Sequence, residues 1–194
     1  MHEHPTLHEL ANDLALSAAA RSALQPDLSR RAFLDRLNEL GLHADALQLL
    51  PHLLERRRAV WWACLCCWDA YRDRLVPALE EALTLVLRWV DEPSEDTRCA
   101  CDLGADVVLN SAANCLRMAV CWSGGSMLPV DLPEVVPPPQ VTAQLSTAAV
   151  LIAAASRGVV ELADKHKLYL SLGIDVLEGE LLWPAASAVV STVA

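Results

Sequence analysis

The sequence predicts an all-α protein, a compact stack or bundle of about seven to nine short helices. Hydrophobic residues make up 54% of the 194 residues but aromatic residues only 5%, so the core must be mostly Leu, Ala and Val. Leu and Ala lead the helix propensity scale. Apolar residues recur at intervals of three and four between glycines and prolines, which is the helical pattern. An α-solenoid-like pairing of the helices stays open, although no strict internal repeat is visible.

The chain divides into three expected parts. Residues 1–25 are weakly patterned, and we expect a loosely packed segment with a helical turn around Leu7 to Ala20. Its histidines lack a Cys or carboxylate partner at suitable spacing, so solvated side chains are favoured over a metal site. Residues 26–184 form a single helical domain, and residues 185–194 form an apolar C-terminal tail.

Glycines, prolines and capping residues mark the expected helices of the domain. Asp27 or Ser29 can cap the first helix, and Gly41 ends it. Pro51 breaks the second helix, and Pro77 begins a later one. Residues 123–140 form a Pro/Gly-rich strap, and Gly173 is expected to weaken the last helix. The expected helices cover about 27–40, 44–51, 51–72, 77–92, 94–103, 105–122, 141–157 and 159–179.

The stretch "VWWACLCCWDAYR" at 60–72 is interpreted as the inside of a helix. Trp61, Leu65 and Trp68 fall on one side, and apolar residues occupy almost the whole circumference. Such a helix is buried from several directions. Free cysteine behaves there as a small hydrophobic residue.

A zinc or thiol-redox protein that uses Cys64 and Cys67 is the chemical alternative. Zinc would need four converging thiolates, and Cys99 and Cys101 are the nearest further pair. On a helix these two point about 200° apart, so they cannot both reach one ion. A redox pair would also need a helix N-terminus to lower its thiol pKa, whereas Cys64 and Cys67 lie in mid-helix. We therefore expect no metal and no cofactor.

Charge and hydropathy limit the partners and the compartment. The net charge of −10 and the pI near 4.9 argue against a nucleic acid partner. The basic cluster Arg56–Arg58 is expected to pair with acids on a helix surface. The start "MHEHPTLHEL" lacks the features of a signal peptide, and the apolar run 146–156 is too short to span a membrane. Seven cysteines, an odd number, then predict free thiols in the cytoplasm.

No catalytic set of residues is visible. The segment "CWSGGSMLP" at 121–129 follows a helix, so its glycines fit a C-terminal cap better than an anion site. There is no G-x-S-x-G elbow and no His paired with an acid near Ser126. His52 and His166 are isolated and are interpreted as structural or surface residues. We therefore expect the protein not to be an enzyme.

The end "LLWPAASAVVSTVA" carries no charged side chain and is the candidate partner-binding segment. Its β-branched residues favour an extended shape, which could add as a strand to the edge of a partner's sheet. Folding back onto its own domain is the equal alternative, because apolar ends are normally buried. The candidate binding residues are Leu182, Trp183, Val189, Val190 and Val193.

Several segments in order carry a family resemblance: "RRRAVWWACLCC", "RWVDEPSEDTRCAC", "AVCWSGGSMLP", "PPPQVTA" and "YLSLGIDVLEGELLWP". Together they resemble an uncharacterised bacterial family, a domain of unknown function often encoded beside type VI secretion genes. The resemblance covers about residues 45–184, and its W-W-A-C and W-S-G-G-S cores are the most specific parts. It implies a helical accessory protein of a contractile secretion system in the cytoplasm, and it supplies no catalytic residue.

The resulting prediction is a non-enzymatic adaptor or chaperone-like protein that binds a secretion-system component or effector. An immunity or regulatory protein that binds a toxin is the first alternative, and the zinc or thiol-redox protein is the second. The predicted partner is a protein in each of the first two cases.

Overall fold

The computed structural model of this chain describes residues 6–25, 27–104, 107–127 and 133–183. Within these ranges it consists of ten α-helices and two 3-10 helices, and it contains no strand. The all-α prediction is therefore confirmed, and eight of the α-helices have seven residues or more. The elements are α1 (Leu7–Asp13), α2 (Ala18–Ala23), α3 (Arg30–Glu39), α4 (His43–Leu49), η1 (Leu50–His52), α5 (Arg56–Tyr71), η2 (Arg72–Arg74), α6 (Pro77–Asp91), α7 (Glu95–Cys99), α8 (Ala112–Cys121), α9 (Val141–Ala155) and α10 (Val159–Glu178).

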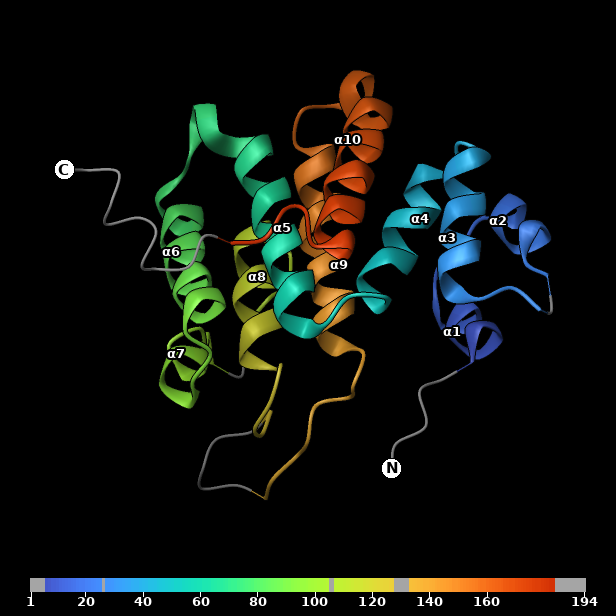
Figure 1. Cartoon of the computed structure of the whole chain (residues 1–194). Coiled ribbons are helices and arrows are strands. Elements are labelled where there is room, and N and C mark those ends of the chain that lie inside the picture. Colours follow the sequence, from blue (N-terminus) through green and yellow to red (C-terminus); the bar gives the residue numbers. More distant parts are fainter. Residues whose placement is uncertain (1–5, 26, 105–106, 128–132, 184–194) are drawn as a thin grey trace.

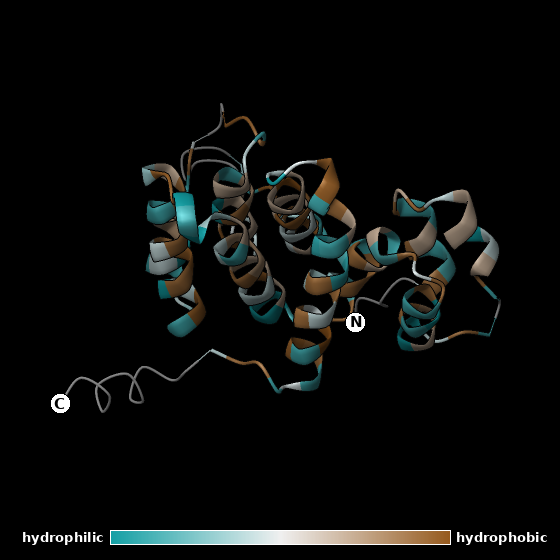
Figure 2. Ribbon diagram, turned by 90° about the horizontal axis from the view of Figure 1, so that it is seen from above, coloured by the Kyte–Doolittle hydropathy of each residue, from teal (hydrophilic) through white to brown (hydrophobic). Residues whose placement is uncertain are grey.

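Helix α5 lies in the middle of the molecule, with the longer helices beside it (Figure 1). It packs against α9, α6, α10 and α8, and α9 packs in turn against α8. The N-terminal helices α1–α3 stand on the far side of α4 from this group (Figure 1). Hydrophilic and hydrophobic residues alternate along the ribbons of the outer helices (Figure 2), as expected for helices that bury one face.

Local signals set most helix boundaries. The Ser29 hydroxyl accepts a hydrogen bond from the Ala32 N–H at 3.1 Å and caps α3. Gly41, with φ of 70°, ends α3, and the Leu42 N–H then bonds back to the Leu37 carbonyl at 2.9 Å. The helix α4 ends at Leu49, and Pro51 is the second residue of η1, in agreement with the predicted break.

Helix α8 begins later than the predicted position of about 105. The described residues 107–110 are not helical, and Ser111 caps the helix by accepting from the Asn114 N–H at 3.2 Å. The Asn114 side chain also donates to the Val108 carbonyl at 2.9 Å. These side-chain hydrogen bonds replace the main-chain hydrogen bonds that a helix would make over residues 107–110, so α8 begins only after Ser111.

The N-terminal segment differs from the loose packing that we expected. Leu10 and Ala20 are buried, and residues 7–23 form α1 and α2. Ser17 attaches the segment to α4 because its N–H and hydroxyl donate to the carboxylate of Asp45 at 2.6 and 2.9 Å. Small apolar and serine side chains gave too weak a periodicity to predict this contact.

The sequence had suggested that the arginines at the start of α5 pair with acids, but within the described residues they form no ion pair and donate to main-chain carbonyls. Arg56 donates to the Ser123 carbonyl just after α8, and Arg57 donates to the Val90 and Asp91 carbonyls at 2.5 and 2.7 Å. Arg58 donates to the Leu177 carbonyl at 3.3 Å. The last carbonyls of a helix lack partners within that helix, and Arg57 and Arg58 supply them for α6 and α10. Arg56 binds the turn that follows α8.

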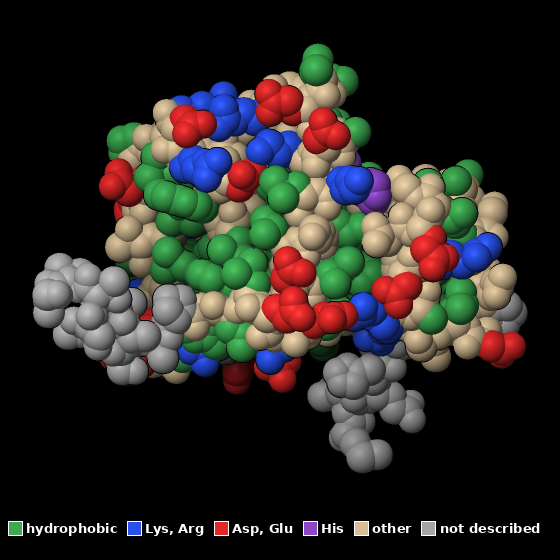
Figure 3. All heavy atoms as spheres, turned by 45° about the horizontal axis from the view of Figure 1, so that its top comes forward, with side chains coloured by type: hydrophobic (Ala, Val, Ile, Leu, Met, Phe, Trp, Pro, Cys, Tyr) green, Lys and Arg blue, Asp and Glu red, His purple; other side chains and the backbone are tan. Residues whose placement is uncertain are grey.

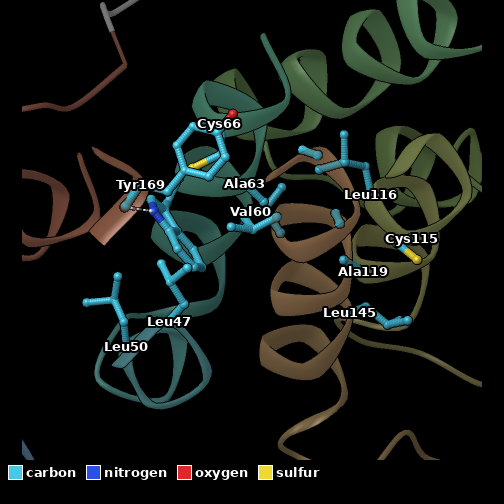
Figure 4. Close-up of a cluster of buried hydrophobic side chains, with 14 of the residues drawn as sticks. Leu47, Leu50, Val60, Ala63, Cys66, Cys115, Leu116, Ala119, Leu145 and Tyr169 are labelled. Carbon is cyan, nitrogen blue, oxygen red and sulfur yellow. Dashed lines mark hydrogen bonds between the residues drawn. The ribbon is translucent and has the colours of Figure 1, made fainter. Parts of the chain in front are cut away.

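Helix α10 approaches α5 closely at Gly173. The Trp62 side chain is fully buried, and its Nε1 donates to the Tyr169 carbonyl at 2.8 Å, the bond dashed in Figure 4. A Cβ built on Gly173 would lie 2.0 Å from Cδ2 of Leu50 and 2.8 Å from Nε1 of Trp62. Gly173 is therefore a packing requirement, and the interpretation as a weak point missed its role.

We expect Gly173→Ala to destabilise the protein by about 1–3 kcal/mol, because the new methyl overlaps Leu50 and Trp62. At an uncrowded helix position the same change would stabilise by up to about 1 kcal/mol. Urea unfolding of the wild type, Gly173→Ala, Leu50→Ala and the double variant measures the coupling. The double variant should lose less stability than the sum of the two single variants. The close approach would be contradicted if Gly173→Ala stabilised the protein, or if the losses of the two single variants simply added in the double variant.

Candidate functional site

The cysteines of α5 lie in the core and not in a reactive site. Cys64, Cys66 and Cys67 are buried and free. Burial raises the pKa of all three thiols, because a thiolate is poorly solvated there. Within the described residues no group of three His, Cys, Asp or Glu side chains could hold a metal ion. The geometry therefore gives the zinc or redox alternative no support.

The glycines of the W-S-G-G-S segment lie against an arginine and not against an open anion site. Arg98 is buried, donates to the Cys121 carbonyl at the end of α8, and forms an ion pair with Glu95. Gly125 has φ of 63°, and a Cβ there would lie 2.5 Å from Nη2 of Arg98. The glycines therefore let this segment pack closely against Arg98 of α7.

An apolar groove between α5 and α6 is the main candidate site. Its volume is about 410 Å³, and Figure 3 shows hydrophobic side chains gathered in a hollow over this face. Trp68 is 52% exposed and Leu87 is 38% exposed. The lining residues are Trp61, Cys64, Leu65, Trp68, Leu75, Glu80, Leu83, Thr84 and Leu87.

Helix α5 is packed from several directions, as predicted, but the groove leaves one of its sides open. Trp61 and Leu65 are only partly buried and Trp68 is exposed, because they face the groove. Trp62, about 100° further around the helix, is fully buried. The spacing of these three residues put them on one face, which was the available signal. Sequence reasoning missed the facing residues of α6, such as Leu83 and Leu87, because the distance between two helices has no local signature.

The two described candidate partner-binding residues lie at one end of this groove. The Trp183 ring packs edge-on against the Trp61 ring, with centroids 6.5 Å apart, and the Arg57 guanidinium lies 4.1 Å from the Trp183 centroid. Leu182 beside it is 41% exposed. Val189, Val190 and Val193 fall outside the described residues.

A second cavity of about 470 Å³ lies between α1, η1, α5 and the start of α9, and His52 is among its lining residues. Burial, followed by the nearby Arg30 charge, lowers the pKa of His52 to about 4. Its Nε2 is buried and has no hydrogen-bond partner within the described part of the chain. His52 is thus a mostly buried side chain that is neutral at pH 7 and lines this cavity.

The described part of the chain is an all-helical protein with an open apolar groove between α5 and α6. Comparison with protein families then shows that the chain belongs to a family of unknown function, DUF6931, whose profile matches residues 33–177. The match begins earlier than the resemblance predicted, since it includes most of α3 and all of α4. No curated protein and no solved structure matched the chain. None of the described helices has both the length and the apolar character needed to cross a bilayer.

We expect a thiol reagent such as DTNB to label one cysteine per native chain, because Cys99 alone of the seven is exposed. Cys99 itself should react slowly, since desolvation and the Glu95 hydrogen bond raise its pKa. Denatured protein should show all seven thiols, and native Cys99→Ser should show none. Rapid native labelling of Cys64 or Cys67 would revive the redox alternative.

Stability should fall as the pH is lowered from 6.5 towards 4 through the titration of His52. In this window the unfolded chain binds a proton at His52 that the folded chain, with its pKa lowered to about 4, does not bind. Between neutral pH and about pH 4.5, the unfolding free energy of the wild type should fall by about 2–3 kcal/mol more than that of His52→Gln, which has no titrating group at this position. Urea unfolding of both proteins across this range measures the difference. If the unfolding free energies of the two proteins changed with pH in parallel, the interpretation of His52 as a buried neutral histidine would be contradicted.

Proposed function

We propose that this protein is a non-enzymatic adaptor that binds a short apolar segment of a protein partner in the α5–α6 groove. The observation that carries the proposal is the exposed apolar surface itself. Trp68 and Leu87 leave a hydrophobic hollow open between two helices. Covering such a surface is favourable at roughly 25 cal/mol per Å² of apolar area removed from water.

The charge of the groove indicates the chemistry of the partner. Glu80 is the one charged residue in the lining and is exposed, and no hydrogen bond or ion pair of its carboxylate is found within the described residues. The chain as a whole carries a net charge of −10. A partner segment with apolar side chains and a Lys or Arg that reaches Glu80 therefore fits both the lining and the overall charge.

The proposed partner is a component or effector of a type VI secretion system. The support for this is the resemblance to a family often encoded beside type VI secretion genes. Capture from the native cells, followed by reconstitution with the purified protein, identifies the partner.

The test compares a groove variant with a matched surface variant. The tagged wild type, Trp68→Ser/Leu87→Ser and Val159→Ser/Val160→Ser are used to capture proteins from the native cells, and the captured protein is then purified and titrated. Val159 and Val160 are 87% and 95% exposed and do not line the groove, so their variant controls for the loss of surface apolar area. The groove variant should weaken binding at least about tenfold, and the control should bind as the wild type.

Glu80→Gln should weaken the same complex by up to about fivefold, the range of an exposed ion pair. Equal binding by the groove variant, with an unchanged melting temperature, would overturn the proposal. If the purified partner is a toxin that the protein inactivates, the adaptor role gives way to the immunity role on the same surface.

A further inference from the structure

The described chain ends beside the open groove. The Nε1 of Trp61 donates to the Leu181 carbonyl at 3.0 Å, and the Trp183 ring rests against the Trp61 ring. Trp61 also lines the groove, so one side chain belongs both to the anchor of the C-terminal segment and to the groove wall. The chain therefore leaves the described region at the mouth of the apolar surface.

The direction of the groove follows from the arginine contacts. Arg57, near the start of α5, donates to the last carbonyls of α6, so the two helices run antiparallel. The groove then extends from Trp61 and Leu87 at the Trp183 end to Trp68 and Glu80 at the other end. With a rise of about 1.5 Å per residue, the distance from Trp61 to Trp68 is roughly 10 Å.

The remaining segment has the length and chemistry to fill this groove. Residues 184–194 read "PAASAVVSTVA" and carry no charged side chain. Extended residues span up to about 3.3 Å each, so this segment exceeds the groove length about threefold. Small apolar side chains match the aliphatic and indole walls, while the segment offers no cation for Glu80.

We propose that residues 185–194 bind in the α5–α6 groove of their own chain as an intramolecular ligand. Leu181 to Trp183 hold the start of the segment at the groove mouth, which keeps its effective concentration near the millimolar range. As a regulatory consequence, which rests on the proposed function, a partner must displace the tail. An intrinsic tail dissociation constant of about 0.1 mM would lower the apparent partner affinity about tenfold. The ion pair with Glu80 then favours a basic partner over the uncharged tail.

The tail is tested without any partner, by fluorescence of the dye ANS, which binds exposed apolar surface. Deletion of residues 185–194 should raise ANS fluorescence at least about threefold, and so should Val189→Ser/Val190→Ser/Val193→Ser. Adding Trp68→Ser/Leu87→Ser to the deletion should abolish the rise, which assigns the dye to the groove. Val159→Ser/Val160→Ser in the full chain should leave the signal unchanged. A synthetic peptide of residues 184–194, at millimolar concentration, should reduce the dye signal of the truncated protein.

Hydrogen exchange and light scattering complete the test. Residues 60–69 of α5 and 79–88 of α6 should exchange faster in the triple-serine variant than in the wild type, with circular dichroism unchanged. The full chain should scatter as a monomer. Unchanged ANS fluorescence and exchange in both tail variants would overturn the proposal, as would a dimer that dissociates when the tail is deleted. Neither outcome depends on the partner titration of the groove variant. The proposal for the tail and the proposal for the adaptor function can therefore be refuted independently.

Discussion

Arg56, Arg57 and Arg58 place three positive charges on the first turn of α5, the end at which a helix dipole disfavours cations. The cost is offset because each guanidinium reaches past its own helix to a carbonyl at, or just after, the C-terminal end of another helix: α8, α6 and α10. Those carbonyls carry partial negative charge and lack partners within their own helices. One turn of α5 thereby fixes the ends of three neighbours.

The same kind of contact recurs across the fold. Arg98 donates to the end of α8, Arg117 to the Cys101 carbonyl after α7, and Arg157 to the Ala70 carbonyl near the end of α5. Guanidinium suits this task because its planar fork can reach two carbonyls at once and stays charged. Helix ends are thus joined by directional bonds, while the cores between them are held by non-directional apolar packing.

These end contacts also determine the candidate site. Because Arg57 joins the start of α5 to the end of α6, the two helices are fixed at one end, and the described Trp183 covers that end. Toward Trp68 the helices are not covered by another described element, and the groove stays open. The open groove is therefore a consequence of helices joined at one end.

Much of the fold could be predicted from the sequence because its signals are local. Ser29, Gly41 and Pro51 act within a turn of their own positions, and the cysteine-rich helix followed from its composition. The acceptors of the arginines could not be predicted, because any helix C-terminus offers the same carbonyls whatever its side chains. Trp61 and Trp62 are adjacent in sequence, and only the placement of α6 and α10 decides which is buried. The groove and the packing of α1 and α2 depend on distances between helices in the same way.

The use of main-chain acceptors has a consequence for tolerance to mutation. A side-chain replacement at Ser123, Val90 or Leu177 leaves the carbonyl in place, so the contact with its arginine survives most changes on that side. The arginines themselves are less freely replaced. Arg57 reaches the Val90 and Asp91 carbonyls with Nε and Nη2, and lysine lacks this planar fork of donors. Three consecutive arginine positions thus link four helices, while these contacts place no demand on the side chains of the residues that accept the bonds.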